Sequence, residues 1–550
     1  MQKEKQLFEL GKYYLSINEL DLAYSILKEV ITSAPDNTNA YELLAQISSL
    51  KGDETSAYKF LKQACSSENC SATALYHLSQ FHLSSQKYSE AIVLLEESIK
   101  KNGKYFEALH DLGTCHANQG ALDKAIDFYS QALQIKDDVP ELFFNLGRLE
   151  DELKNYPKAI NYYDKATSLR QNYAEAWSHK GLTLHELGKY EDALTAYETA
   201  LHLMPNYPEA SSYKAVTLHE MRCYTDALTF HDKAIALNPS YNDAYWNKAL
   251  TQLILGNFQD GWINYEYRWT KLKPQPYKHS NIPPLIANTC LIGKKILVWS
   301  EQGYGDTLQF SRYIPLLIES GAQVIFETPK SLLNLLAQNI HCQVVEDYDP
   351  KFMADYQAPL LSLPLIFKTS LKSIPPINPV ITPSEKSLVK WGKRLSTSNK
   401  KINIGIACSG NSQHQNDRNR SMPLINFLPL LSIANLYLIQ KDIRQDDAKC
   451  LIDHPEIKHL GADLDDFDDT AAIIDSMDLI ISVDTSVAHL AGAMMKSIFI
   501  LLPFTPEWRW MTEGDASPWY PTIKIYRQST KGDWKTLIHQ IMIDLKLMER

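Results

Sequence analysis

The 550-residue sequence predicts an α-solenoid of paired helices followed by an α/β region built from two Rossmann-like units. Three observations lead to this prediction. A pattern of small and apolar residues returns every 34 residues from Glu4 to Gln275. From Lys295 onward, short apolar runs alternate with stretches of helical periodicity, which is typical of βαβ units. A proline-rich stretch, Ile374–Pro383, divides this second region into two parts.

The repeat is defined by two positions at which small residues return. The copies begin at Glu4, Thr38, Ala72, Phe106, Pro140, Ala174, Pro208 and Asn242. Their eighth positions are Gly11, Ala45, Ser79, Gly113, Gly147, Gly181, Ala215 and Ala249, and their twentieth positions are Ala23, Ala57, Ala91, Ala125, Ala159, Ala193, Ala227 and Gly261. Small residues there let paired helices cross closely, and a period of 34 is that of tetratricopeptide repeats. Such arrays display a long binding surface, so we expect the chemistry to lie in the region that follows.

Each repeat is expected to hold two helices. In the fourth repeat, apolar spacing predicts one helix over Phe106–Gln119 and another over Leu122–Ile135. Glycines such as Gly120 stand at the turn between the helices, where a left-handed C-cap is expected. The recurring tyrosines, Tyr129, Tyr163 and Tyr197, are interpreted as core between helices rather than as a ligand site.

The eighth repeat departs from the pattern. Position twenty becomes Gly261, and position 27, elsewhere usually alanine, becomes Arg268. Large aromatic residues surround these changes: Trp262, Tyr265, Tyr267 and Trp269. Because a terminal repeat must cover its open face, these residues predict docking onto the following domain. The polar, proline-rich segment after Lys271 (KPQPYKHSNIPP) is predicted to be a short linker.

Composition excludes several classes of protein. The formal net charge of −10 argues against nucleic-acid binding, which depends on a clustered basic surface. No apolar run is long enough to cross a bilayer. The eight cysteines have no CxxC spacing, so we expect free thiols in a reducing environment and a cytoplasmic location.

The second region is predicted to contain two parallel sheets, each covered on both faces. The expected strands are 296–299, 323–327, 343–345, 402–408, 436–440, 480–483 and 498–502, with helices over Thr307–Ser320 and Ser331–Gln338. The predicted domains are a solenoid of eight repeats (1–275), a first Rossmann-like unit (285–380) and a second one (384–550). Ligands of such folds lie at the carboxyl ends of the strands, which makes the loops there the candidate sites.

The first candidate loop, 300–309, contains Gly303, Gly305 and Asp306 between a strand and a helix. Two glycines followed by an acid at a helix start suit close approach of the backbone to a ligand. Asp306 could equally cap the helix and have no other role. By itself this loop does not decide between the two interpretations.

The second candidate loop, 408–423, follows another strand and combines amides, His414, Arg418 and Arg420. Guanidinium groups match phosphate oxygens, so this loop is a candidate for binding a phosphorylated ligand. The alternative is an ordinary solvated loop.

The third candidate loop follows the strand 480–483 with Asp484, Thr485 and Ser486, which begin a helix of small residues. The first N–H groups of such a helix and its dipole favour a diphosphate. His489, in the first turn or just beyond it, would face either the ligand or the core.

Together these loops resemble the ADP-heptose lipopolysaccharide heptosyltransferases of glycosyltransferase family 9. The resemblance covers roughly 296–534 and is closest to a bacterial subgroup in which the transferase half follows tetratricopeptide repeats. The matching segments are Glu301-Gln-Gly-Tyr-Gly-Asp-Thr-Leu-Gln-Phe310, Leu502-Pro-Phe-Thr-Pro-Glu-Trp-Arg-Trp510, Ser517-Pro-Trp-Tyr-Pro521, Arg420 before a proline, and Val483-Asp-Thr-Ser486 with His489.

The resemblance implies a GT-B fold, with the acceptor on the first Rossmann-like unit and a nucleotide-diphosphate sugar on the second. It implies that Asp306 is the general base for the acceptor hydroxyl and that Gly303 and Gly305 belong to the acceptor-side loop. Arg420 stands where the family carries a phosphate-contacting lysine, and a guanidinium fork differs from that point charge.

The same resemblance implies that Thr485, Ser486 and the amides after them hold the diphosphate, with Asp484 and His489 beside the donor. Gln440 and Lys441 fall near a further donor-contacting position. The implied chemistry needs neither a metal nor another cofactor. Asp463-x-Asp465 looks like a metal-binding DxD motif but lies in an acidic loop of the wrong half, and we discount it.

The predicted function is therefore transfer of a sugar from a nucleotide-diphosphate donor to an acceptor, possibly a protein or peptide, that the repeats select or position. Protein O-GlcNAc transferases also combine such repeats with a GT-B domain, and they hold peptides through a ladder of asparagines. Here the corresponding sixth positions are Glu9, Leu43, His77, Asp111, Asn145, His179, Tyr213 and Asn247, so that ladder is largely missing. The alternative is a protein-interaction scaffold with an idle transferase-like domain.

Overall fold

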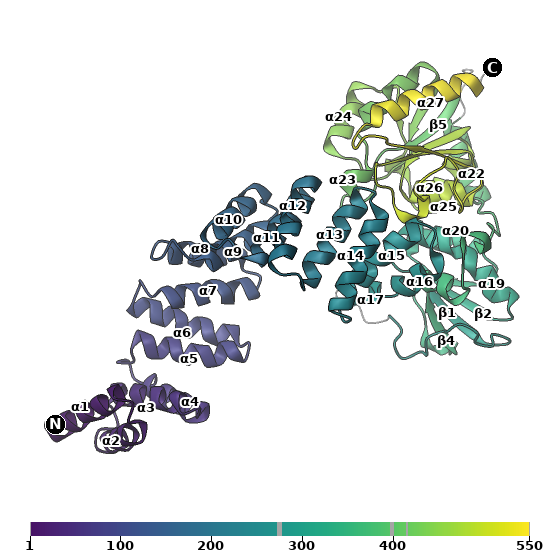
Figure 1. Ribbon diagram of the computed structural model, residues 1–550. Helices are drawn as coiled ribbons and strands as arrows, with labels where there is room; N and C mark the ends of the chain where they lie inside the picture. Colours follow the sequence, from purple (N-terminus) through teal and green to yellow (C-terminus); the bar gives the residue numbers. More distant parts are fainter. Residues whose placement is uncertain (1, 272–277, 396–400, 414–415, 549–550) are drawn as a thin grey trace. The chain divides into compact units, whose positions relative to one another are not determined.

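The computed structural model describes residues 2–271, 278–395, 401–413 and 416–548 (Figure 1). Contacts between Cα atoms divide the chain into two compact units, Met1–Tyr213 and Lys214–Arg550. The first holds most of the helical repeats. The second holds the remaining repeats together with all of the strands.

The predicted repeats are present as helix pairs. Their helices are α1 (Gln2–Ser16), α2 (Leu20–Ser33), α3 (Thr38–Leu50), α4 (Glu54–Ala64), α5 (Ala72–Ser84), α6 (Tyr88–Lys101), α7 (Phe106–Asn118), α8 (Leu122–Leu133), α9 (Pro140–Glu152), α10 (Tyr156–Leu169), α11 (Ala174–Glu186), α12 (Tyr190–Leu203), α13 (Pro208–Glu220), α14 (Tyr224–Leu237), α15 (Asn242–Ile254) and α16 (Phe258–Tyr265). From α3 to α15, every odd-numbered helix begins at the first residue of a predicted repeat. The 34-residue period is thereby confirmed.

Close packing explains the glycines at position eight. A Cβ atom on Gly113, Gly147 or Gly181 would come within 2.6 Å of a tyrosine ring in the next helix. These rings belong to the recurring tyrosines, among them Tyr163, and all of them are buried. The prediction that the tyrosines form core between helices is confirmed, and glycine is the residue that makes room for them.

The structure corrects the expectation that all eight cysteines are free. Cys65 and Cys70 form a disulfide in the loop between α4 and α5. Their Cα atoms are 4.9 Å apart because the short loop turns back on itself, and this separation suits a disulfide. The remaining cysteines are free thiols.

The second unit contains two parallel sheets. The strands are β1 (Lys295–Trp299), β2 (Gln323–Glu327), β3 (Gln343–Val345), β4 (Tyr356–Pro359), β5 (Ile402–Ala407), β6 (Ala434–Leu438), β7 (Lys458–His459), β8 (Leu479–Val483), β9 (Ile498–Leu502) and β10 (Ile523–Arg527). The first sheet has the order β3-β2-β1-β4 and the second has the order β10-β9-β8-β5-β6-β7. This arrangement agrees with two Rossmann-like units. Sequence reasoning missed β4, β7 and β10, which end the two sheets.

The helices of this unit also differ in part from the prediction. They are α17 (Arg268–Lys271), α18 (Tyr304–Phe310), α19 (Ile314–Glu319), α20 (Lys330–Asn339), α21 (Leu363–Ile366), α22 (Glu385–Leu395), α23 (Asp417–Arg420), α24 (Gln445–Asp453), α25 (Phe467–Asp475), α26 (Ser486–Ala493) and α27 (Trp534–Met548). The single helix expected over 307–320 is instead α18 and α19, joined by a 3-10 turn at 311–313. Pro315 in the first turn of α19 has no N–H to continue a longer α-helix.

We expected helices to cover both faces of the first sheet. In the described part of the chain, helices α19 and α20 cover one face only, and the other face is closed differently. Its side chains Ile296, Val298 and Phe326 belong to the main core together with residues of α19 and α20. On the opposite face, Leu297 and Trp299 pack against Trp269 and against residues of the loop 346–355. This face is therefore closed by the chain that leaves the last repeat and by a loop.

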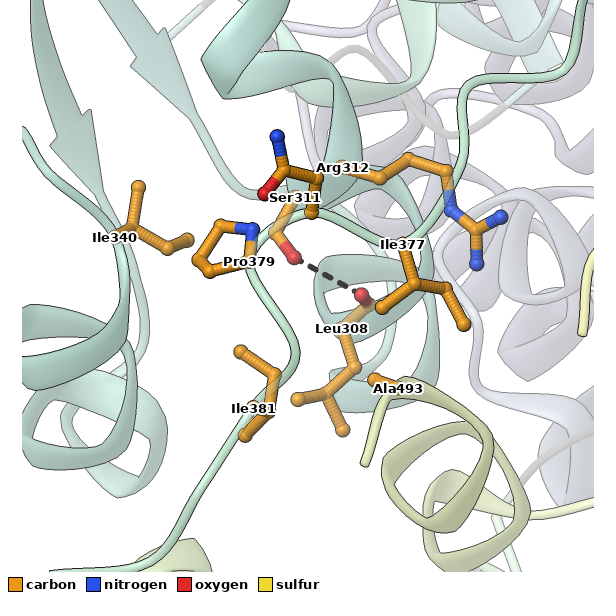
Figure 2. A pocket seen from close by; sticks show the side chains of 9 residues that line it. Leu308, Ser311, Arg312, Ile340, Ile377, Pro379, Ile381 and Ala493 are labelled. Carbon is orange, nitrogen blue, oxygen red and sulfur yellow. Dashed lines mark hydrogen bonds between the residues drawn. The ribbon is translucent and has the colours of Figure 1, made fainter. Parts of the chain in front are cut away.

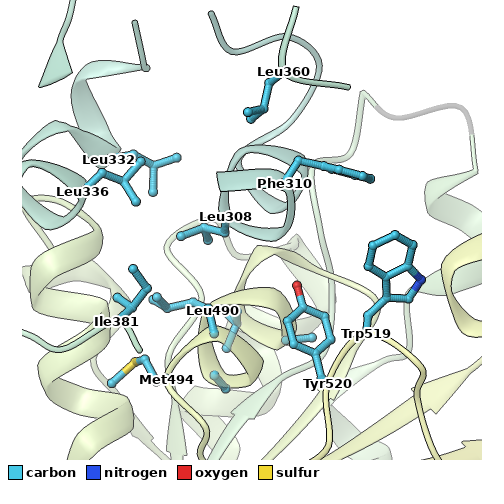
Figure 3. Close-up of a cluster of buried hydrophobic side chains, with 14 of the residues drawn as sticks. Leu308, Phe310, Leu332, Leu336, Leu360, Ile381, Leu490, Met494, Trp519 and Tyr520 are labelled. Atoms are coloured by element: carbon cyan, nitrogen blue, oxygen red, sulfur yellow. The ribbon is translucent and has the colours of Figure 1, made fainter. Parts of the chain in front are cut away.

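The aromatic residues of the eighth repeat dock onto the α/β part of the second unit, as predicted. Trp262 in α16 lies edge-on to Trp508, with ring centroids 5.3 Å apart, and its Nε1–H donates to the carbonyl of Thr369 at 3.1 Å. Figure 3 shows the adjoining cluster, in which Phe310 and Trp519 lie above Leu490 of α26. The terminal repeat and the α/β part thus share one core.

Part of the predicted linker lies against the first sheet. Residues 272–277 fall outside the described part of the chain. After them, Ile282 is buried, and Leu285 N–H donates to the carbonyl of Gln357 in β4 at 2.7 Å. The proline-rich stretch 374–383 contains neither a helix nor a strand. A short 3-10 turn, Leu371–Ser373, ends just before it. In the described part of the chain, no helix combines the length and apolar character needed to span a membrane.

Candidate functional site

The first and third candidate loops meet where α18 packs against α26. A Cβ atom on Gly305 would come within 2.7 Å of the imidazole carbon Cδ2 of His489, so only glycine permits this approach. Gly305 follows the carboxyl end of β1, and His489 follows that of β8. The carboxyl ends of the two sheets therefore face a common region.

Asp306 lies in the first turn of α18. Its Oδ2 accepts a hydrogen bond from the N–H of Gly303 at 2.8 Å, which is the back-bonding half of a capping box. The capping interpretation is thus supported, but it occupies only one carboxylate oxygen. Oδ1 forms an ion pair with the Nη2 group of Arg509, and the side chain remains 17% exposed. Asp306 accordingly has both a structural role and access to solvent.

Arg509, which sequence reasoning did not select, is the centre of this cluster. Its Nε donates to Oε1 of Gln309 at 2.6 Å, and its Nη1 forms an ion pair with Glu507. Burial lowers the pKa of Arg509, but Glu507 and Asp306 outweigh this and raise it overall. Arg509 could have been selected from the sequence, because it lies in Leu502–Trp510, one of the segments that resemble the heptosyltransferases.

The pKa values of two carboxyl groups near Arg509, those of Glu507 and Asp484, are raised. Burial is the largest cause that raises the pKa of Glu507, to about 8; Arg509 opposes this rise, and Asp484 adds to it. Burial also raises the pKa of Asp484, although Arg420 and Arg509 lower it. Asp306, Asp484 and Glu507 thus influence one another, and perturbed carboxyl groups in such a cluster are typical of functional sites.

The third loop offers the beginning of a helix, as predicted. Asp484 follows β8, Thr485 is the N-cap of α26, and Ser486 is its first residue. The side chain of Thr485 makes no cap hydrogen bond at this end of the helix, and its hydroxyl group lies 3.1 Å from that of Ser482. Among the described residues, the N-cap side chain therefore accepts from none of the first amide groups of α26, an arrangement that suits an anion.

His489 serves the core as well as this site. Its Nδ1 lies 3.0 Å from the hydroxyl of Tyr520, and its Nε2 lies 3.7 Å from Oδ1 of Asp484. Burial is the main cause that places the pKa of His489 well below its usual value, and nearby arginines such as Arg509 add to this effect. The imidazole is therefore neutral at physiological pH, and its contact with Asp484 is no ion pair.

Arg420 connects the second loop to the third. It is the last residue of α23, and its Nη1 donates to the backbone carbonyl of Asp484 at 3.2 Å. A Cβ atom on Gly410 would come within 2.7 Å of its Nη2, so glycine allows the guanidinium to lie there. Its Nε is buried without a hydrogen-bond partner in the described part of the chain. An orphaned cationic N–H beside a helix N-terminus is a feature that a phosphate oxygen would satisfy.

Gln440 and Lys441 have other neighbours. Oε1 of Gln440 accepts from the N–H groups of Cys408 and Ser409 at 2.8 and 3.1 Å, so this side chain supports the start of the second loop. Lys441 is exposed and donates to the carbonyl of Leu464 at 3.2 Å. Among the described contacts, neither side chain touches Asp306, Arg420 or Asp484. His414 of the second loop lies outside the described residues.

A small pocket lies beside the junction of α18 and α26 (Figure 2). It is lined mainly by apolar side chains, among them Leu308, Ile377, Ile381 and Ala493. Its cavity volume of ≈ 10 Å³ is at the lower limit for a single water molecule, so it is no substrate site.

The acidic motif Asp463-x-Asp465 is engaged in ion pairs. Asp463 pairs with Arg394 at 3.1 Å and Asp465 with Lys390 at 2.9 Å. Within the described ranges, no group of three or more His, Cys, Asp or Glu side chains has the geometry to hold a metal ion.

Comparison with known proteins identifies the repeats. Residues 105–172 and 174–207 match two family models, each described as a tetratricopeptide repeat. The chain is a tetratricopeptide-repeat protein with a C-terminal α/β domain. No matching family model names a glycosyltransferase domain.

This repeat protein is also similar to single proteins. It is 22% identical over 328 residues to Protein FlbA of Caulobacter vibrioides, which covers 54% of this chain and 53% of FlbA, so the chain spans about half the length of that relative. Among solved structures, YrrB, described as a TPR protein with an unusual peptide-binding site, is 22% identical, with 34% of this chain and 98% of YrrB covered and a TM-score of 0.31. A TPR repeat-containing protein of Cytophaga hutchinsonii is 16% identical, with 44% and 98% covered and a TM-score of 0.36.

Proposed function

We propose that this protein is a glycosyltransferase of the heptosyltransferase-like, GT-B type, which transfers a sugar from a nucleotide-diphosphate donor. One observation carries the proposal. The Asp306 turn after β1 lies against α26, whose N-terminal end follows β8, and Arg420 bonds to the same turn of β8. A carboxylate from one sheet and an anion-binding arrangement from the other thus occupy neighbouring positions at the carboxyl ends of the strands.

In the proposed reaction, the diphosphate of the donor is held by the first amides of α26 and by Arg420. In the described part of the chain, the Nε–H of Arg420 has no hydrogen-bond acceptor, with Oδ1 of Asp417 4.0 Å from Nε, and a diphosphate oxygen would supply one. Thr485 and Ser486 would add hydroxyl groups. As the bond between the sugar carbon and the phosphate oxygen breaks, these groups stabilise the negative charge on the departing nucleoside diphosphate.

Asp306 would accept the proton of the acceptor hydroxyl while the hydroxyl oxygen forms the new bond to the sugar carbon. A carboxylate has about four lone-pair positions. Its bonds to Gly303 and Arg509 therefore leave positions that can accept a hydrogen bond from the hydroxyl group of the acceptor substrate. Arg509 holds the carboxylate in one orientation. Arg509 also pairs with Glu507, whose pKa is raised by burial although Arg509 opposes the rise.

Isothermal titration calorimetry with UDP, GDP and ADP tests the donor site. We expect the wild-type protein to bind at least one of them and the Thr485→Ala/Arg420→Ala double variant to lose at least about 1.4 kcal/mol, a factor of ten in Kd. Asp306→Asn should keep this affinity while donor hydrolysis or transfer falls by about 10²–10⁴-fold. Unchanged binding by the double variant would refute the assignment of the donor site.

The repeats imply a protein partner, and we propose that the acceptor is a protein or peptide that they position. The scaffold alternative gains support from one observation: both oxygens of Asp306 already have partners within the protein. The scaffold would be favoured if the full-length protein bound none of the nucleoside diphosphates and Asp306→Asn retained a partner as tightly as the wild type.

A further inference from the structure

The last repeat sends one side chain directly to the loop that carries Asp306. Arg268 in α17 has an exposed fraction of 0%. Its Nε and Nη2 donate to Oε2 and Oε1 of Glu301, both at 2.8 Å, which is the bidentate geometry of a strong ion pair. At the same position, most other repeats carry a small residue. The arginine is thus a departure from the repeat that serves contact with another element.

Further bonds complete the network around Arg268. Its Nη1 donates to Oε1 of Glu266 at 2.7 Å, and its Nη2 also donates to the hydroxyl of Ser362 at 2.8 Å. Ser362 in turn donates to Glu266, and Glu301 accepts from the N–H of Leu361 at 3.2 Å. The charged groups are all paired, which is the condition under which a buried ion pair persists.

The loop between Glu301 and Asp306 is held in a restricted conformation. Gln302 has a φ of +60°, in the left-handed region that is unfavourable for a non-glycine residue and persists only where neighbours enforce it. The hydroxyl of Tyr265, also from the last repeat, lies 3.4 Å from Oε1 of Gln302. The next residue, Gly303, donates the hydrogen bond that orients Asp306. A continuous series of contacts therefore leads from Arg268 to the carboxylate.

We infer that Arg268 is a positioning residue for the reaction: through Glu301 it fixes the loop 300–306 and so the direction of the Asp306 carboxylate. The inference rests on the proposed function of Asp306. It makes the eighth repeat part of the site rather than only a support for the other repeats. Arg268 is not placed against substrate or reacting atoms, and its direct bond to the loop is the one to Glu301.

The test compares Arg268→Met/Glu301→Leu with the wild-type protein. Removing both charges avoids leaving Glu301 buried and unpaired, and Glu266, which also loses its partner, has a side chain that is 27% exposed, so we expect the double variant to fold. Its affinity for UDP, GDP or ADP should stay within about threefold of the wild type, because the donor site lies on the second sheet. Donor hydrolysis should fall by about 100-fold, since a displacement near 1 Å has an effect of that size.

Amide hydrogen exchange gives a readout that does not depend on activity. Residues 300–306 should exchange faster in the double variant, while α26 should be unchanged. Lys524→Met/Asp544→Leu, which removes a 2.6 Å ion pair between β10 and α27, is the control and should alter neither loop exchange nor hydrolysis. Arg268→Lys, which keeps the charge without the fork, should restore part of the hydrolysis lost in Arg268→Met.

Normal hydrolysis together with normal loop exchange in the Arg268→Met/Glu301→Leu variant would overturn the inference. If the wild-type protein binds no nucleoside diphosphate, the proposed function fails independently. In that case the exchange of residues 300–306 alone decides whether Arg268 holds the loop, and unchanged exchange overturns that as well.

Discussion

The fifth and eighth repeats have the same two-helix arrangement but pack against different neighbours. In the fifth, Gly147 admits the ring of Tyr163, and the hydroxyl of that tyrosine donates to Oδ2 of Asp151 at 2.7 Å. In the eighth, Trp262 and Arg268 extend out of the pattern into the α/β part of the second unit. The comparison shows that a repeat keeps its sequence rule where its neighbours are repeats and changes it where they are not.

The largest effect is expected where the eighth repeat departs furthest from the rule. Arg268→Met leaves the buried Glu301 and the partly exposed Glu266 with no cation between them, which should cost about 3–5 kcal/mol of the free energy of unfolding. Lys180→Met in the sixth repeat, which removes a partly exposed pair with Asp164, should cost at most about 1 kcal/mol. Urea unfolding followed by circular dichroism measures both variants.

Tryptophan fluorescence separates the two units in this experiment, since Trp177 is the one tryptophan before residue 214. The Arg268→Met change should appear in the fluorescence transition. Equal effects of the two variants would remove the distinction between the repeats.

Gly147→Ala should have the next largest effect. The added methyl group would lie 2.6 Å from the Tyr163 ring, and such overpacking typically costs about 1–3 kcal/mol. Gly261→Ala in the eighth repeat meets Cδ2 and Cγ of Leu253 at 2.7 and 2.9 Å, an aliphatic side chain rather than a rigid ring, so its cost should be smaller. Thermal unfolding of the two variants gives the order, and a larger loss for Gly261→Ala would contradict it.

Tyr163→Phe sharpens the description of the interior repeats. It removes the hydroxyl that donates to Asp151 but keeps the ring against Gly147, so we expect a loss of about 1 kcal/mol. Asp151 also accepts from Oγ1 of Thr183 in the next repeat at 2.7 Å and should keep that bond. A loss as large as that of Gly147→Ala would show that the hydroxyl, rather than the ring, holds these repeats together.

The smallest predicted effect is a pH dependence of the free energy of unfolding that arises from Glu507 in the second unit. The pKa of Glu507 is about 8 in the folded protein and near 4.5 when unfolded, so the folded state binds the extra proton between these values. Stability from this group therefore falls as the pH rises from about 4.5 to 8 and is constant above that range. Glu507→Gln should flatten this part of the profile. Parallel wild-type and Glu507→Gln profiles from pH 5 to 8 would contradict the prediction.

Sequence reasoning was most successful where structure follows from local pattern. The starts of the repeats and the bounds of β2, β3 and β9 agree with the prediction, because helical period and apolar runs are visible within a few residues. The strands that were missed are short or lie at sheet edges: β4 ends in a proline, and β7 has two residues. β4 is mostly buried, but its sequence Tyr-Gln-Ala-Pro is no continuous apolar run, and in β10 Ile523, Ile525 and Tyr526 are separated by Lys524, so the apolar signal of these strands is weak.

The residues of the candidate site also fall into those that a local sequence pattern indicated and those that it did not. Glycines, acids and hydroxyl groups after strand ends were found because the order of strand, turn and helix is local. Arg509 was not found, because its partner Asp306 is 203 residues away in the sequence. Gln440 was selected as a residue near the donor, and its amide group also supports the backbone of Cys408 and Ser409. No local pattern reveals such a partner.

The linear order of residues was enough to establish the 34-residue repeat, the change to α/β structure near Lys295, and the three loops that follow strands, since each depends on neighbours in the chain. Only the folded chain revealed that Arg509 binds Asp306, that Arg420 reaches the turn after β8, and that Arg268 of the last repeat holds Glu301. The physical reason is that burial pairs a charged group with whichever opposite charge the fold brings near it, at any distance along the chain.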